Sequence, residues 1–163
     1  MKQIVLKSGR SILEKVPSPT IVPGTILVKV LYSCISQGTE IIGLRNTGKN
    51  RAEKIISTLK EKPQAIQKAI QIYKEQGFTS LTKKIYSSTN SSLRAQPTGY
   101  SVSGVVEAIG ENVDKFAIGD LVACAGAGMA NHSEYVLVPK NLTMKIPKGL
   151  DLKLASTVTL GGI

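Results

Sequence analysis

Residues 99–147 read GYSVSGVVEAIGENVDKFAIGDLVACAGAGMANHSEYVLVPKNLTMKIP, and this stretch decides the fold. Apolar residues between Val102 and Ile109 predict a strand, which stops at the turn residues Gly110–Asn112. The apolar pattern resumes through Phe116 and Ile118, which predicts a second strand after that turn.

The second half of the stretch continues this pattern. Leu121–Ala125 is a short apolar segment, and Tyr135–Val138 predicts a strand that is buried on both faces. Between them, Gly126–Asn131 resembles a dinucleotide-binding G-x-G-x-x-G, but it lacks the last glycine and precedes a strand, so we expect a loop. Short strands joined by glycine-containing turns predict a small closed or partly closed β-barrel.

The same residues carry a resemblance to a known family. The order G-x-x-x-x-G-x-V-x-x-x-G-x-x-V-x-x-x-x-x-G-D-x-V, followed by S-E-Y-V-x-V-P, resembles the GroES-like substrate domain of medium-chain dehydrogenase/reductases. That superfamily contains zinc alcohol dehydrogenases and zinc-free quinone oxidoreductases. The motif is carried by Gly99, Gly104, Val106, Gly110, Val113, Gly119, Asp120, Val122 and Ser133–Pro139. The resemblance implies a mainly β fold, a GroES-like partly open β-barrel.

The composition is that of a globular domain. The chain has 163 residues, of which 42% are hydrophobic, enough for one domain with a core. Cys34 and Cys124 lie far apart with no CxxC pair, which argues against a disulfide framework and a structural zinc knuckle. The N-terminus MKQIVLKSGR has no apolar core of signal-peptide length, and no apolar stretch reaches membrane-span length. We therefore expect a cytoplasmic protein with no membrane partner.

The N-terminal residues predict further strands. Residues 3–15 alternate around Ser8-Gly9-Arg10, which predicts a hairpin with glycine at the turn. A strand buried on both sides is expected next, with one face made by Ile26, Val28 and Val30 and the other by Leu27 and Leu31. It leads into Ser33–Glu40, which in the superfamily faces the cofactor cleft.

Residues 49–88 have helical periodicity, with apolar residues at i, i+3, i+4 and i+7 before and after Pro63, and we expect an α-helical insertion there. Residues 45–94 hold eleven Lys or Arg against three Glu, a net charge of +8 out of +10 for the chain. The insertion resembles that of bacterial two-part oxidoreductases, which implies a sugar-derived substrate, and its positive charge could attract an anionic one. Alternatively, the chain is a non-catalytic binding module whose insertion binds a partner domain, an anionic ligand or nucleic acid, although we do not expect nucleic acid because stacking aromatics are scarce.

The expected domain organisation follows from these segments. Residues 1–48 and 95–150 would form the barrel, 49–94 the basic helical insertion, and 151–163 the start of a linker helix that Asp151 could cap. In the superfamily that helix leads into the Rossmann nucleotide-binding domain. We therefore expect the chain to be a fragment without this domain, inactive by itself, from a protein that could form a homodimer when intact.

The resemblance also locates the zinc ligands of alcohol dehydrogenases, which are two Cys and one His. The first cysteine position holds Gln37, Tyr100 replaces the histidine of G-H-E, and the third ligand falls near Thr159 or Leu160. We expect no zinc and no metal site. The single histidine, His132, is expected to be a surface loop residue before the last strand, with a functional role as the alternative.

Without zinc, hydrogen-bond donors must polarise a carbonyl or enone oxygen while NAD or NADP on the absent domain exchanges hydride. The resemblance gives Thr39 the place of the proton-relay hydroxyl, and Tyr100 could donate to a developing oxyanion. Thr39 could instead bond its own backbone, and the Tyr100 ring could simply fill the space left by the metal. Residues expected near the cofactor are Gln37, Gly38, Glu40 and Thr159. Gln37 could instead contact the substrate or be a solvated amide, and Glu40 could instead orient a neighbouring residue.

Overall fold

The computed structural model describes residues 1–48 and 95–161. The predicted helical insertion and the alternative of a binding module based on it lie outside these residues. The chain divides into two compact units, each of which is described by itself. Unit 1 comprises Met1–Val5, Ile12–Glu40 and Pro97–Ile163, and unit 2 comprises Leu6–Ser11 and Ile41–Gln96.

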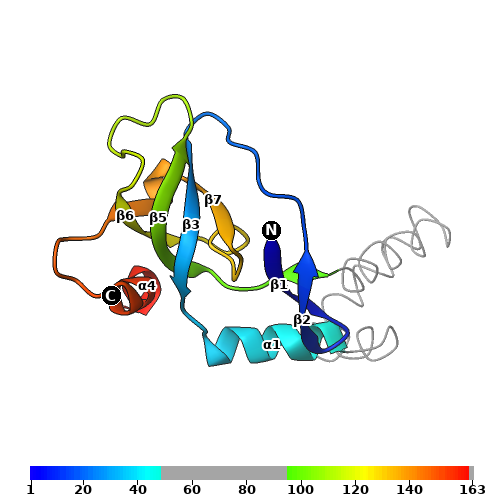
Figure 1. Cartoon of the computed structure of the whole chain (residues 1–163). Coiled ribbons are helices and arrows are strands. Elements are labelled where there is room, and N and C mark those ends of the chain that lie inside the picture. Colours follow the sequence, from blue (N-terminus) through cyan, green and yellow to red (C-terminus); the bar gives the residue numbers. More distant parts are fainter. Residues whose placement is uncertain (49–94, 162–163) are drawn as a thin grey trace, which may run out of the picture. The chain divides into compact units, whose positions relative to one another are not determined.

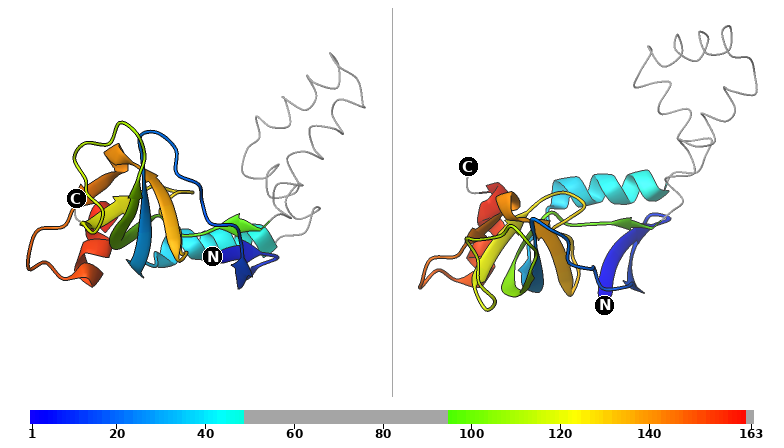
Figure 2. Two further views of the ribbon diagram at one scale, coloured as in Figure 1. Left: turned by 45° about the horizontal axis from the view of Figure 1, so that its top comes forward. Right: turned by 90° about the horizontal axis from the view of Figure 1, so that it is seen from above.

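Unit 1 is built on a five-stranded sheet that curls on itself (Figures 1 and 2). Its strands lie in the order β7-β3-β5-β6-β8, and every neighbouring pair is antiparallel. Because β7 and β8 are the two ends of the sheet, it forms a half-barrel, which confirms the predicted partly open barrel. The strands are β3 (Thr25–Ser33), β5 (Ser101–Ile109), β6 (Leu121–Ala125), β7 (Tyr135–Pro139) and β8 (Thr143–Lys145), with the 3-10 helix η1 (Lys140–Leu142) between the last two.

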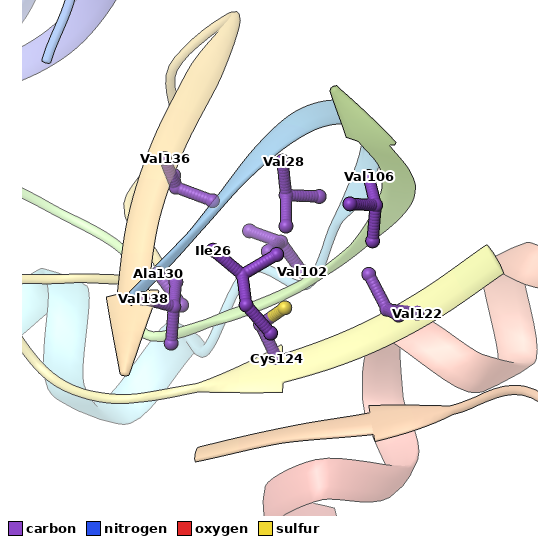
Figure 3. Packing of buried hydrophobic residues seen from close by; sticks show 9 residues of the cluster. All are labelled: Ile26, Val28, Val102, Val106, Val122, Cys124, Ala130, Val136 and Val138. Atoms are coloured by element: carbon purple, nitrogen blue, oxygen red, sulfur yellow. The ribbon is translucent and has the colours of Figure 1, made fainter. Parts of the chain in front are cut away.

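The core fills the inside of the curl. Apolar side chains from four strands and one loop pack together there, each at most 2% exposed (Figure 3). They are Ile26, Val28, Val102, Val106, Val122, Cys124, Ala130, Val136 and Val138. Most are β-branched, and these residues suit a pleated, half-buried surface.

The prediction that β3 is buried on both sides is wrong. Ile26 and Val28 are fully buried, whereas Leu27 is half-buried, Lys29 is exposed and Leu31 is 45% exposed. Successive side chains of a strand point to opposite faces, and a curled antiparallel sheet has only one inner face. β7 follows the same rule, since its Val residues are buried while its other side chains are half-buried.

The strand predicted through Phe116 and Ile118 is also absent from the described structure, where these residues lie in the loop between β5 and β6. Asp120 Oδ2 accepts a hydrogen bond from Ala117 N–H at 2.7 Å and closes a turn. Phe116 packs against the core from this loop, whereas Ile118 is 71% exposed. Phe116 therefore anchors the loop to the core and Ile118 does not, so the apolar spacing of these two residues does not mark a strand.

A second sheet contains β1 (Lys2–Lys7), β2 (Arg10–Lys15) and β4 (Gln96–Pro97), in the order β2-β1-β4. The predicted hairpin of residues 3–15 is confirmed. Ser8 and Gly9 both have positive φ, 49° and 75°, as the favoured two-residue hairpin turn requires.

Two helices are described, α1 (Gln37–Gly48) and α4 (Leu152–Gly161). Helix α4 lies against β5, β6 and β3 (Figure 1). It begins as expected, because Asp151 Oδ1 accepts hydrogen bonds from Lys153 N–H at 2.7 Å and Leu154 N–H at 3.1 Å. In the described parts of the chain, no helix has the length and apolarity needed to cross a membrane.

Candidate functional site

The first turn of α1 carries four of the six predicted site residues, Gln37 to Glu40. Glu40 N–H donates to Ser36 O at 3.0 Å, the first bond of the helix. In return, Glu40 Oε1 accepts a hydrogen bond from Ser36 N–H at 3.1 Å. This reach-back bond to the N-cap amide is similar to one half of a capping box, but it comes from the fourth helical residue instead of the third.

The Thr39 hydroxyl lies on the outside of this turn. Thr39 is exposed, and its Oγ1 accepts a hydrogen bond from Ser36 Oγ at 3.3 Å. Because a hydroxyl both donates and accepts, this bond leaves the Thr39 proton available for donation. Gln37 and Gly38 are also exposed.

The prediction that His132 is a surface loop residue is wrong. His132 is 7% exposed, and its Nε2 lies 3.0 Å from Glu40 Oε1. The His132 and Glu40 side chains are 5% and 17% exposed. Its backbone explains the burial, since His132 N–H donates to Thr98 O at 2.9 Å and His132 O accepts from Ile4 N–H at 2.8 Å. These bonds draw the loop into unit 1.

The segment of Tyr100 meets the same histidine. A Cβ atom on Gly99 would lie 2.8 Å from His132 N and 3.0 Å from the ring carbons Cδ2 and Cε1. Gly99 has φ 96°, a conformation that favours glycine. Tyr100 follows directly, is half-buried, and accepts a hydrogen bond at its carbonyl from Gly126 N–H at 2.9 Å. His132 therefore contacts Glu40, the neighbour of Thr39, and Gly99, the neighbour of Tyr100.

Thr159, the last predicted cofactor residue, takes part in a hydroxyl network between α4 and β5. Ser101 Oγ donates to Ser156 O at 2.5 Å and also contacts Thr159 Oγ1. Because Ser101 has one hydroxyl proton, Thr159 must be the donor in the second bond. The Thr159 hydroxyl thus holds α4 on the sheet, and its role toward a cofactor stays a prediction.

The residues at the zinc-ligand positions do not fit a zinc ion. Gln37 offers an amide, Tyr100 a phenol, and the Thr159 hydroxyl is engaged by Ser101. Cys124 is fully buried in the core, where burial raises the pKa of its thiol to about 11 and disfavours a metal-binding thiolate. Among residues 1–48 and 95–161, no three His, Cys, Asp or Glu side chains lie together as metal ligands would.

Comparison with known proteins agrees with this fold. The alcohol dehydrogenase GroES-like domain family matches residues 78–148. A quinone oxidoreductase of Pseudomonas aeruginosa is 34% identical over 65 residues, which is 40% of this chain and 20% of that protein. Residues 78–148 thus match the alcohol dehydrogenase GroES-like domain family, and part of the chain is similar in sequence to quinone oxidoreductases.

Solved structures share the fold at low sequence identity. The quinone oxidoreductase from Coxiella burnetii has a TM-score of 0.62 at 17% identity, with 96% of this chain and 40% of that chain covered. A mycobacterial protein complexed with NADPH has a TM-score of 0.58 at 19% identity, with 99% and 38% covered. The chain thus spans about 40% of the solved structures and one fifth of the curated relative.

Proposed function

We propose that this chain is the substrate-side domain of a zinc-independent, NAD(P)-dependent oxidoreductase that transfers hydride to or from a carbonyl or enone. The observation that carries the proposal is the arrangement around His132, which joins the turn of Thr39 to the segment of Tyr100 through Glu40 and Gly99. The relationship to quinone oxidoreductases supports the reaction class.

The site offers neutral hydrogen-bond donors in place of a Lewis acid. Thr39 can donate its proton, and the phenol of Tyr100 can donate to an oxygen that gains negative charge. A bound nicotinamide would supply or accept the hydride. Exposed Gln37 and Gly38 suit an approach by the cofactor, whereas Glu40 and Thr159 already have partners within unit 1.

A nucleotide-binding domain must then face this unit, and an apolar surface supports its presence. Large apolar side chains are exposed on α4, at the end of β3 and in the residues that follow β3. Helix α4 and strand β3 are in contact, and Lys153 Nζ lies 5.7 Å from the centre of the Tyr32 ring. The exposed residues are Leu31, Tyr32, Ile35, Leu154 and Val158, with Ile35 at 70%. Large exposed apolar side chains on two adjacent elements are typical of a covered interface.

The test uses the longer protein that contains this chain and a nucleotide-binding domain, with oxidation of NADH and NADPH followed against a quinone and an enone. We expect turnover without bound zinc, and a fall in kcat of about a hundredfold in Thr39→Val and Tyr100→Phe, as for loss of a proton donor. Thr157→Val and Tyr135→Phe are matched controls and should keep the wild-type rate.

Two results would overturn parts of the proposal. Stoichiometric zinc, or turnover abolished by chelators, would remove zinc independence. Wild-type rates in both Thr39→Val and Tyr100→Phe would remove the assigned roles. The chain by itself is expected to show no hydride transfer.

A further inference from the structure

We propose that His132 is a positioning residue that holds the first turn of α1, and with it the Thr39 hydroxyl, in place beside the segment of Tyr100. The proposal rests on the function proposed above for Thr39 and Tyr100. It is drawn from the buried hydrogen bond between His132 and Glu40, two residues that lie 92 positions apart in the sequence.

The chemistry fixes the direction of this bond. A carboxylate only accepts hydrogen bonds, so His132 Nε2 carries the proton that it donates to Glu40 Oε1. The same oxygen also accepts from Ser36 N–H. Removal of the imidazole donor would leave a largely buried carboxylate with this backbone bond alone, and such groups are costly to leave under-paired. Glu40 would then turn toward water and draw its turn with it.

The histidine itself is fixed to the half-barrel. Its backbone N–H and carbonyl bond to Thr98 and Ile4, which hold the backbone of His132 in place, and the bond from Nε2 to Glu40 orients the ring. Gly99 packs directly against the imidazole ring. A Cβ atom at Gly99 would lie only 3.0 Å from two of the ring carbons. The ring therefore sets the position of the Gly99–Tyr100 segment by contact and the position of the α1 turn by its hydrogen bond.

The first experiment measures amide hydrogen exchange by NMR in this chain. His132→Phe keeps the ring volume and removes the donor. We expect the exchange of the Ser36 amide to rise about tenfold or more, since hydrogen bonds to charged groups are the stronger ones, while the amides of Val28 and Val106 keep their protection. Unchanged exchange at Ser36, or an equal rise throughout the sheet, would overturn the proposal.

Glu40→Ala gives the upper limit of this effect, because it removes the acceptor of the Ser36 N–H itself. It should raise the exchange of the Ser36 amide at least as much, and the double variant His132→Phe/Glu40→Ala should raise it no further, because both changes break one coupled unit. An additive rise would contradict the proposal. Glu134→Gln is the control, since Glu134 lies two residues from His132 and its carboxylate accepts from Lys2 N–H instead.

The second experiment measures turnover in the longer oxidoreductase. His132→Phe should lower kcat about tenfold with the KM of the nicotinamide unchanged, and His132→Gln, whose amide can donate, should restore part of both kcat and Ser36 protection. If the wild type shows no turnover, the proposed function fails, and the exchange at Ser36 still decides the positioning role. If His132→Phe turns over at the wild-type rate, the positioning role fails and the proposed function stands.

Discussion

Gly104 is a position at which the half-barrel has no room for a side chain. It lies in β5 opposite Val30 of β3, and a Cβ atom there would stand 2.1 Å from Lys29 O and 2.9 Å from Lys29 C. Ordinary contact begins at 3.4 Å, so the overlap with backbone exceeds 1 Å. Gly104→Ala must therefore force β3 and β5 apart, because a backbone carbonyl in a strand cannot rotate away as a side chain can.

The expected loss of stability follows from what these strands carry. Overpacking a core costs about 1–3 kcal/mol, and each ladder hydrogen bond that is broken adds about 1 kcal/mol. We expect Gly104→Ala to lower the free energy of unfolding by about 3–5 kcal/mol, a large part of the ~5–15 kcal/mol typical of a domain. With an m-value of about 2 kcal/mol/M, the urea midpoint should fall by roughly 2 M.

Urea unfolding followed by far-UV circular dichroism measures this shift, which suits a chain without tryptophan. Gly38→Ala is the matched control, since Gly38 lies in α1 and a Cβ there meets nothing within 4 Å. Its free energy of unfolding should stay equal or rise by up to about 1 kcal/mol, as helix propensity predicts. A Gly104→Ala midpoint equal to that of the wild type would refute the close approach of β3 and β5.

Three further predictions concern a cap and two titrating groups. Asp151→Ala should cost about 1 kcal/mol of unfolding free energy, while Asp151→Asn keeps the cap of α4, as urea midpoints will show. Burial raises the pKa of Cys124 from 9.0 to about 11. The stabilising effect of its neutral thiol is therefore complete below pH 9 and is lost as the pH rises toward 11. Iodoacetamide at pH 8 should modify Cys34 and spare Cys124 until the protein unfolds. The hydrogen bond from Lys145 at 2.7 Å, with that from Ala117 N–H, lowers the pKa of Asp120 below 3.8. The contribution of this carboxylate to the free energy of unfolding is therefore present above pH 3.8 and is lost as the pH falls through the lowered pKa. Lys145→Met should raise the pKa of Asp120 in an NMR titration.

Local signals sufficed for much of the half-barrel. Turn glycines and alternating valines predicted the hairpin of residues 3–15 and the strands β5 and β7, because these features act within a few residues of the sequence. Burial on both faces of β3 was predicted wrongly, since Leu27 and Leu31 are apolar although they lie outside the curl. The curl depends on pairing between β3, β5 and β7, which no single segment encodes.

Helix α1 shows how a weak local pattern hides an element. Its sequence contains three glycines and has no apolar stripe, so helical periodicity does not mark it. The signal that was present is the pair of Ser36 and Glu40, whose reach-back bond starts the helix. The two residues are four apart, one more than in the common capping box, so the pair is a weak indication of a helix start in the sequence.

His132 carried no signal of its own, since one imidazole in a loop of small residues fits a surface position equally well. Its burial comes from partners at Ile4, Thr98 and Glu40, which the chain brings together only after the strands have paired. This arrangement shows which partners hold the residues at and beside the expected zinc-ligand positions. Glu40, the acidic residue beside those positions, is held by an imidazole of the protein, and Thr159 is held by Ser101. Thr39 and Tyr100 therefore stay the predicted donors to a substrate oxygen, because His132 contacts the residue next to each of them.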